Sequence, residues 1–401
     1  MQPHRLTSAA NCIFDFLSQW ILPLGLLVLL SGMFFLESRN ALTSFYLGLF
    51  GIPSLLMLCL RPSEIKILLG EPIIAGFLAL CIWLCLSLLW SPPENQDFGM
   101  MKIPLQPLML FAGCAMLLQY RNEALKPLLF CAASIALVAT IDYLVPFIKN
   151  YVPGDRMIGG GAFTNPLLSS HLFGFFCIYW LCICITSQRL SILWLSVPAV
   201  AVMLVAVLAT GSRTPLVALA LCILWLSIVS RNRRALVLIA GMLLGSAAIL
   251  LVFPEILGDR GSSYRLQIWQ IALGRIAEHP WIGHGYDAEL HIDVGLGYPL
   301  MEPHSFALGV LYYIGIIGLI PWTFVLGWGL LSSYRQRLQP LFVLASTLLV
   351  YGIGAGLTEG GAVLTRPREH WFLLWIPLAL IAALNIANRR NQVKNTKPVQ
   401  A

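Results

Sequence analysis

Arginine and histidine residues beside long apolar runs are the side chains in this sequence most suited to chemistry. Arg156, Arg213 and Arg265 stand in three successive polar segments, and His304 directly precedes a further apolar run. A guanidinium can bind phosphate through two parallel hydrogen bonds, and histidine accepts a proton near neutral pH. These residue types therefore indicate a site that binds a phosphorylated ligand and moves a proton.

Arg213 lies in the segment Thr210-Gly211-Ser212-Arg213-Thr214-Pro215. We predict that Thr214 caps the following helix and that Pro215 is its first residue, because proline has no amide hydrogen to lose there. The unpaired amides and partial positive charge of this helix N-terminus would then add to the guanidinium in binding phosphate. The alternative is an arginine that only extends toward the membrane interface.

Arg156 precedes the glycine-rich segment Gly159-Gly160-Gly161-Ala162-Phe163-Thr164-Asn165-Pro166. Asn165 is predicted to cap the next helix, with Pro166 at its first position. The successive glycines either let the backbone approach a ligand closely or form a flexible turn. His171, on the first turns of this helix, is expected to be a core or interface residue.

The longest polar stretch covers residues 254–304. We predict a helix capped by Ser262 that continues to about Glu278, with Arg265 in its first turn and Arg275 complementing the dipole at its end. This helix would lie along the membrane surface or cover a cavity. Its predicted apolar stripe consists of Leu266, Trp269, Leu273 and Ile276.

The rest of this stretch is predicted to be a mobile loop over the site that ends at His304, the candidate base. Its carboxylates receive no individual roles: Asp287, Glu289, Asp293 and Glu302. A later polar loop adds Glu359, Arg366 and Arg368 as supporting residues. Glu359 is expected to orient either His304 or an arginine.

The composition indicates the elements that position these residues. The 401 residues are 58% hydrophobic and 11% charged, whereas charged residues make up about a quarter of soluble domains. A soluble domain is therefore excluded, and we predict one all-α integral membrane domain over residues 1–401 with a short basic tail at 388–401. Apolar runs long enough to cross a bilayer predict about 12 transmembrane helices; they lie near 20–36, 42–60, 72–90, 103–119, 125–148, 166–186, 190–209, 214–230, 235–253, 305–331, 340–357 and 370–387.

The distribution of basic residues predicts the orientation. Most of the 25 lysines and arginines fall in alternate loops if both termini are cytoplasmic, as the positive-inside rule requires. Positive charge nevertheless accumulates in three consecutive outer loops, which indicates an anionic ligand on that side; it is contributed by Arg156, Arg213, Arg260, Arg265 and Arg275. The outer loops contain no Asp-x-Asp motif, so we expect no bound metal and assign charge neutralisation to the arginines.

Several of these segments occur in an order that resembles a known family. They are Arg156 with Gly161 to Pro166, Thr210 to Arg213, Arg265 followed by Trp269, Pro280-Trp281-Ile282-Gly283-His284-Gly285, and the histidine entering the next span. Across roughly residues 150–330 they resemble the O-antigen ligase and polymerase family of bacterial polysaccharide assembly, and most closely its O-antigen ligases. Ser305 and Leu167 stand where the family often has asparagine.

The resemblance implies a GT-C-like, metal-independent glycosyltransferase of lipopolysaccharide biosynthesis in the bacterial inner membrane, without cofactor or nucleic acid. Its donor would be an undecaprenyl-pyrophosphate-linked glycan, its acceptor a sugar hydroxyl of lipid A-core, and its surroundings membrane lipids. Arg213 and Arg265, together with Arg156, would hold the diphosphate at the periplasmic face. His304 would deprotonate the acceptor hydroxyl for a direct, inverting displacement.

There are four alternative functions for this sequence. An O-antigen polymerase would use the same donor and a second lipid-linked glycan as acceptor, and a protein-glycosylating ligase belongs to the same broad family. A transporter or flippase for the lipid-linked glycan would need ionisable residues near the midplane and a repeat between halves. A membrane scaffold would leave the outer arginines unexplained.

Overall fold

A computed structural model of the protein describes residues 8–92, 97–187, 189–230, 233–252 and 264–396. Arg260, the predicted cap Ser262 and the rest of residues 253–263 lie outside the described residues, as does the end of the basic tail at 397–401. Within the described part the regular structure is helical, apart from one isolated antiparallel bridge between Ile292 and Leu300.

The first part of the chain forms long rods from shorter helices. A π-helical turn over Leu17–Ile21 joins α1 to α2, and a second over Leu47–Gly51 joins α3 to α4. Short 3-10 helices lie at Gly32–Phe34, Leu88–Trp90, Phe98–Lys102 and Asn122–Ala124. The α-helices are α1 (Ser8–Phe16), α2 (Leu22–Ser31), α3 (Arg39–Tyr46), α4 (Ile52–Leu60), α5 (Ser63–Leu69), α6 (Pro72–Ser87), α7 (Leu105–Tyr120) and α8 (Leu125–Lys149).

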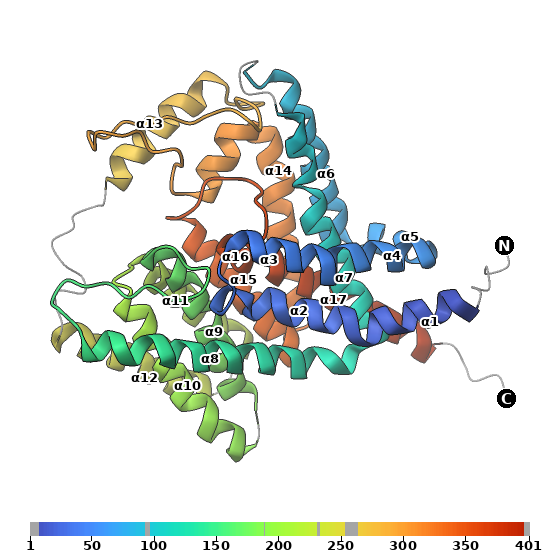
Figure 1. The fold of residues 1–401 in the computed structure, drawn as a ribbon, viewed down its shortest axis with the longest axis horizontal. Helices are drawn as coiled ribbons and strands as arrows, with labels where there is room; N and C mark the ends of the chain where they lie inside the picture. Colours follow the sequence, from blue (N-terminus) through green and yellow to red (C-terminus); the bar gives the residue numbers. More distant parts are fainter. Residues whose placement is uncertain (1–7, 93–96, 188, 231–232, 253–263, 397–401) are drawn as a thin grey trace.

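The second part contains the most deeply buried helices and the one long polar segment. Its α-helices are α9 (Pro166–Thr186), α10 (Leu190–Ala209), α11 (Thr214–Ser230), α12 (Arg233–Val252), α13 (Arg265–Glu278), α14 (Phe306–Arg335), α15 (Pro340–Gly356), α16 (Glu369–Leu373) and α17 (Trp375–Thr396). Figure 1 shows α13 outside the main bundle, beside α14.

The described helices identify a multi-pass membrane protein. Eight of them are long and apolar enough to cross a membrane, and two shorter apolar helices cover 214–230 and 340–356. Each apolar run predicted from the sequence overlaps a helix. The all-helical membrane class is therefore confirmed.

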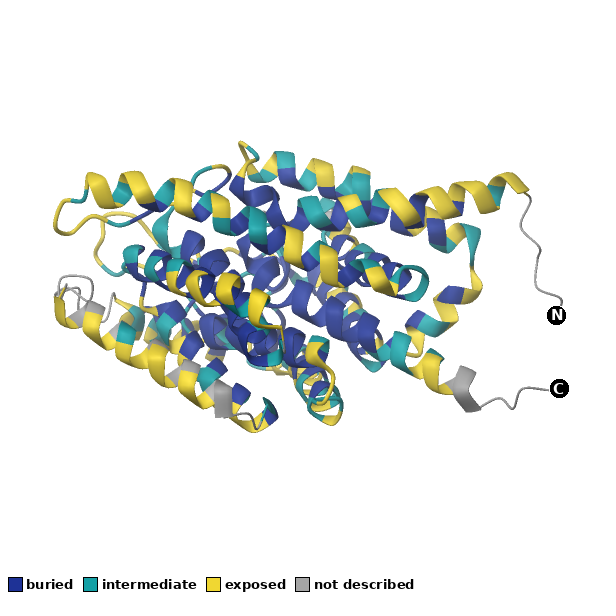
Figure 2. Ribbon diagram, turned by 90° about the horizontal axis from the view of Figure 1, so that it is seen from below, coloured by how far each residue is buried: buried dark blue, intermediate teal, exposed yellow. Residues whose placement is uncertain are grey.

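Burial follows the pattern expected of a bundle surrounded by lipid. The helix Pro166–Thr186 is central, since 94% of its apolar window is buried, and it packs against α10, α11 and α15. Figure 2 shows the buried residues inside the bundle and the exposed ones along the outer helices. Exposed residues such as Trp194 and Leu251, each 82% exposed, are large and apolar, as a lipid-facing surface requires.

The helix that follows His304 is broken at Gly315, whose backbone is not helical (φ 65°, ψ −170°). The turn at residues 280–285 fills this break. The amides of Ile316 and Ile317 donate to the carbonyls of Pro280 and Trp281 at 2.9 and 3.1 Å. The turn thus supplies acceptors for amides that the broken helix leaves without an intrahelical partner.

The same turn also donates hydrogen bonds to α14. The amides of His284 and Gly285 donate to the carbonyls of Tyr312 and Tyr313 at 2.8 and 2.9 Å. Gly283 has a φ of +72°, and a Cβ there would lie 2.5 Å from the backbone of Tyr313. The Pro-Trp-Ile-Gly-His-Gly motif is therefore a backbone dock that fixes α13 to α14.

The polar segment has a small hydrophobic core of its own. This core consists of Ile268, Ala272, Ile276, Ala288, Leu290, Ile292 and Tyr312. The stretch predicted to be a mobile loop is therefore packed against α13 and α14. The predicted stripe on α13 is wrong in part, because Leu266 and Leu273 are 66% and 52% exposed. The helix turns Ile268 and Ala272 inward instead, since the core lies on that flank.

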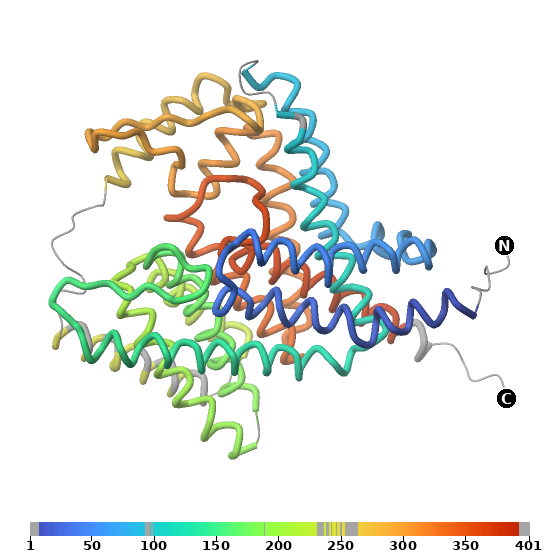
Figure 3. Tube along the Cα trace, viewed as in Figure 1, coloured from blue at the N-terminus to red at the C-terminus, as the bar shows by residue number. Residues whose placement is uncertain are grey.

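The first helix begins and the last helix ends on the same side of the molecule (Figure 3). There the buried carboxylate of Glu64 accepts from Tyr120 at 2.6 Å and from Arg390 at 3.1 Å. Arg61 lies over the ring of Phe14 at 3.9 Å. The contact between Arg390 and Glu64 ties the last helix to the first part of the chain.

Candidate functional site

Polar segments from three parts of the chain surround one cavity of about 320 Å³. One wall comes from the loop before α9, a second from the residues before α14, and a third from the loop between α15 and α16. The cavity is lined by Arg156, Asn165, Pro166, Leu167, Leu168, Glu302, His304, Glu359 and Arg368. The structure thus brings together Arg156, His304, Glu359 and Arg368 from the predicted set.

Glu359 is the central charge of this cavity. Its Oε2 lies 3.7 Å from His304 Nδ1 and 3.6 Å from Arg265 Nη2. Glu359 is only 4% exposed. The carboxylate predicted to face either the histidine or an arginine thus faces both.

Electrostatics keep Glu359 ionised. Burial raises the pKa of a carboxyl group, but the facing imidazole of His304 outweighs this and lowers the pKa of Glu359 to about 2. A permanent negative charge therefore lies behind the candidate base.

His304 has a strained backbone. Its φ is 49°, a conformation uncommon for a residue with a side chain and often stored at functional sites. Ser305 and Phe306 then begin α14. One turn into α14, the backbones of Gly309 and Gly361 lie close together, since a Cβ on Gly309 would collide with the carbonyl of Gly361.

Glu302 and Arg368 form the opposite part of the lining. Burial raises the pKa of Glu302, and the charge of Glu359 adds to this rise, whereas Arg368 and His304 lower it. The other carboxylates of the segment have local partners. Asp287 accepts from the amide of Asp97, Glu289 faces His291 and Asp293 accepts from the amide of Gly295.

Arg156 joins two of the predicted loops. Its Nε donates to the carbonyl of Thr210 at 2.7 Å, and its Nη2 donates to Ser212 Oγ at 2.9 Å. The loop before α9 ends as predicted, because the side chain of Asn165 accepts from the amide of Leu168 at 2.8 Å. This cap fixes the backbone that carries the lining residues 165–168.

Arg265 lies at the first position of α13, after Tyr264 with φ 60°. Its Nη2 also lies 3.5 Å from Thr214 Oγ1, which is 3.1 Å from Thr358 Oγ1. Thr214, the predicted cap, is the first residue of α11 in the structure, so this helix begins one residue earlier than predicted. Its hydroxyl faces the side chain of Arg265, the first residue of α13.

Three predicted arginines are absent from the cavity lining: Arg213, Arg265 and Arg366. Arg265 still reaches the lining residue Glu359. Arg213 is exposed next to Thr214, and its carbonyl accepts from the amides of Leu216 and Val217. Arg366 is exposed on the loop after α15. The structure therefore connects Arg265 to the cavity and brings neither Arg213 nor Arg366 to its lining.

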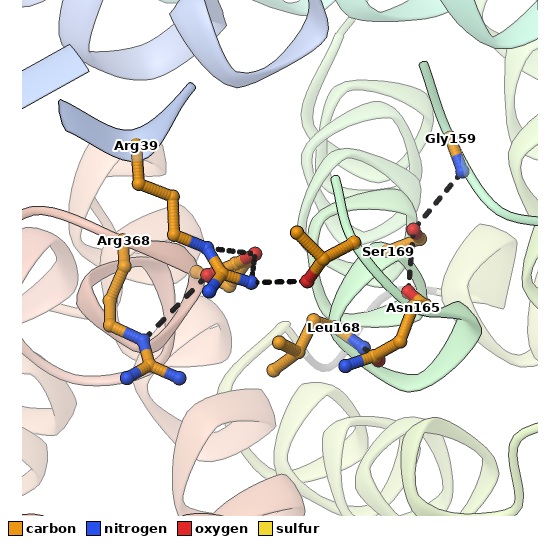
Figure 4. Close-up of polar contacts among 8 residues, drawn as sticks. Arg39, Gly159, Asn165, Leu168, Ser169 and Arg368 are labelled. Carbon is orange, nitrogen blue, oxygen red and sulfur yellow. Dashed lines mark hydrogen bonds and ion pairs between the residues drawn. The ribbon is translucent and has the colours of Figure 1, made fainter. Parts of the chain in front are cut away.

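A buried ion pair beside the cavity was not singled out from the sequence. Arg39 Nη2 donates to Glu369 Oε1 at 2.8 Å and to Thr164 Oγ1 at 2.6 Å, and Arg368 Nε lies 3.8 Å from Glu369 Oε2 (Figure 4). Glu369 is fully buried. The sequence signals for this pair are an arginine between two apolar runs and a carboxylate directly before the run predicted at 370–387.

Two buried histidines lie behind the cavity. The prediction that His171 is a core residue is confirmed, since it is 0% exposed. His370, which the sequence analysis did not consider, lies with its ring centre 6.4 Å from that of His171 and 5.3 Å from that of Phe306. Among the described residues, no group of three or more His, Cys, Asp and Glu could hold a metal ion.

The helical bundle and its cavity lined by arginine, histidine and glutamate residues define a multi-pass membrane protein. The O-Antigen ligase family matches residues 198–323. The chain is also 41% identical over 387 residues to an O-antigen ligase of Pseudomonas aeruginosa, with 96% of each chain covered. The chain therefore belongs to the O-antigen ligase family, and the resemblance inferred from its motifs is confirmed over a longer stretch than the motifs span.

Proposed function

We propose that this protein is a glycosyltransferase that moves a glycan from undecaprenyl pyrophosphate to a sugar hydroxyl of lipid A-core in lipopolysaccharide biosynthesis. The observation that carries the proposal is the contact of one buried carboxylate, Glu359, with both His304 and Arg265 at a cavity. A base and a phosphate-binding group are the two parts that such a transfer needs. The 41% identity to an O-antigen ligase supports the substrate class.

The arginines are assigned to the donor. Arg265 and Arg156, together with Arg213, would bind the pyrophosphate and stabilise the charge that develops on it as the glycosyl bond breaks. Arg265 Nε has no hydrogen-bond partner among the described residues. Buried donors are normally paired, so this atom is available to a phosphate oxygen. We expect transfer without an added divalent cation, because these guanidinium groups supply the positive charge.

His304 is assigned to the acceptor. Its Nδ1 faces Glu359, which leaves Nε2 to take the proton of the acceptor hydroxyl. The acceptor oxygen would form a bond to the anomeric carbon as the bond to the pyrophosphate breaks, and the pyrophosphate leaves with the electron pair. One such displacement inverts the anomeric centre. Glu359 would hold the ring in place and stabilise the imidazolium that forms.

The remaining lining residues shape the space for the two sugars. Glu302, Arg368 and Asn165 lie around the same cavity as His304. Residues 254–304 would act as the active-site loop of a single membrane domain. We place this loop at the periplasmic face of the inner membrane and both termini in the cytoplasm, in agreement with the charge distribution.

The test is transfer from a polyprenyl-pyrophosphate glycan to lipid A-core by purified protein in detergent without added metal. His304→Ala should lose transfer and keep donor binding. His291→Ala is the matched control, because this histidine is 54% exposed in the same polar segment and is paired with Glu289. Normal transfer by His304→Ala contradicts the assignment.

The same assay separates the other functions. A polymerase would elongate a second lipid-linked glycan in preference to lipid A-core when both acceptors are present. A flippase would convert neither acceptor, because transport needs two compartments and leaves the substrate unchanged.

A further inference from the structure

A second polar cavity lies at the far end of α14 from His304. It measures about 270 Å³ and is bounded by α6, α14 and α17 (Figure 1). It is lined by Pro72, Trp328, Ser332, Arg335, Gln336, Asn385, Asn388, Arg389 and Gln392. Helix α14 has 30 residues and is broken at Gly315. His304 lies just before its first residue, whereas the second cavity is lined by its last turns, so the two cavities lie at opposite ends of α14.

Positive charge predominates at this second cavity. An adjoining cavity of about 310 Å³ shares Arg389 and is lined by Lys66, Ile67, Gly70, Ile386 and Arg390. Arg389 pairs with the buried Glu71, and Arg390 pairs with Glu64. Within the described chain, Lys66 and Arg335 have no carboxylate partner. The second cavity and the adjoining one together retain an excess of positive charge.

The cavity also offers polar and aromatic groups suited to a headgroup. Asn385 already donates to Glu71 and to Ser332. Asn388 Nδ2, by contrast, is buried without a hydrogen-bond partner in the described structure. The Arg335 guanidinium lies 5.8 Å from the centre of the Trp328 ring, which orients it at the membrane interface.

An apolar stripe continues from this cavity along α14. Ile320, Phe324 and Leu331 are 63%, 43% and 42% exposed, and their spacing places them on neighbouring turns of one helix face. The ring of Phe324 stacks on Trp328 at 5.9 Å between centres. A ligand that fits has an anionic head for the cavity and hydrocarbon for the stripe.

We propose that this cavity binds the phosphodiester headgroup of an anionic phospholipid, whose acyl chains lie along the exposed face of α14. Basic pockets between transmembrane helices commonly bind such headgroups. Arg335 in this cavity and Lys66 in the adjoining one supply the charge, Asn388 supplies a neutral donor, and Trp328 marks the level of the headgroups. The site is separate from the cavity that contains His304.

The experiment measures lipid retention by the full-length protein in detergent, using native mass spectrometry after addition of phosphatidylglycerol or phosphatidylcholine. Wild-type protein should retain phosphatidylglycerol preferentially. Arg335→Gln and Lys66→Gln should each weaken retention about fivefold, since a basic residue near an anionic membrane contributes roughly that factor. Arg337→Gln is the matched control. It removes the same charge near the same helix end, but the Arg337 side chain points to the ring and carbonyl of Tyr334 instead of the cavity.

Inorganic phosphate tests whether a free anion could occupy the site instead of a lipid. If the ligand is a lipid, inorganic phosphate should leave the midpoint of thermal unfolding unchanged at concentrations where phosphatidylglycerol raises it. Equal retention by Arg335→Gln and Arg337→Gln would overturn the site. Stabilisation by inorganic phosphate without any preference for phosphatidylglycerol would overturn the lipid as its ligand.

Discussion

The Oε2 atom of Glu359 lies 3.7 Å from Nδ1 of His304 and 3.6 Å from Nη2 of Arg265. One buried oxygen therefore contacts the candidate base and a candidate phosphate-binding group, which come from different parts of the chain. The loop between α15 and α16 thus connects the residues before α14 to the start of α13. In the proposed reaction, this carboxylate would position both groups on one substrate.

Replacing Glu359 by glutamine should slow transfer strongly and leave the fold intact. The amide keeps the shape but removes the charge that stabilises a protonated imidazole, so we expect kcat to fall about 100-fold, within the range of general acid–base catalysis. KM for the donor should change less. Glu289→Gln is the control, since that carboxylate is 54% exposed and faces only His291. Equal rates in the two variants would exclude a positioning role for Glu359.

The stability of the protein should depend on pH through Glu359 with a definite sign. Burial alone would raise the pKa of this carboxyl group, but the facing His304 lowers it from 4.5 to about 2. The resulting contribution, on the order of 3 kcal/mol, is present above pH 4.5 and is lost as the pH falls toward 2. Thermal midpoints of wild type and Glu359→Gln should therefore converge in acid.

Glu302 provides an internal check on that measurement. Burial raises the pKa of Glu302 above 4.5, so its protonated form is the one favoured by folding. The protonated Glu302 therefore contributes to the free energy of unfolding below pH 4.5, and this contribution is lost as the pH rises through the raised pKa. Relative to Glu302→Gln, the wild type should lose stability as the pH rises, which is the opposite trend.

Substitutions at Arg265 should separate charge from geometry. Arg265→Ala should weaken donor binding and transfer together, whereas Arg265→Lys should recover only part of both, because an ammonium cannot make the planar two-point contact. Binding of a polyprenyl-pyrophosphate glycan and the transfer rate are the two measurements. Arg275→Ala is the control, since Arg275 is 54% exposed on the same helix and pairs with Glu278. Full recovery by lysine would show that a point charge is sufficient.

The class of fold was predictable because length and hydropathy determine it. A run of apolar residues long enough to cross a bilayer must be helical to satisfy its backbone, and each predicted run overlaps a helix. The break at Gly315 was not predictable, since its cause is the turn at residues 280–285. A contact between segments distant in the sequence leaves no local periodicity.

The site was predictable in its residue types more than in its contacts. Arg156, His304, Glu359 and Arg368 all line the cavity, because charged residues beside apolar runs are costly without a role. The prediction of the inward face of α13 was partly wrong. Ile268 and Ala272 are turned inward because they pack against residues 288–292, a contact that the spacing within the helix does not show. Arg39 and Glu369 pair across more than 300 positions, a distance at which spacing carries no information.

The dock between the turn at 280–285 and the break in α14 should be sensitive to a single methyl group. Gly315 has a φ of +65°, and a Cβ there would collide with the carbonyl of Trp281. Gly315→Ala should therefore cost about 1–3 kcal/mol and reduce transfer by displacing α13 and Arg265. Gly327→Ala, on the same helix, has open space within 4 Å and should be neutral or slightly stabilising. Thermal midpoints and transfer rates in detergent distinguish the two variants, and equal behaviour would show that the dock does not position Arg265.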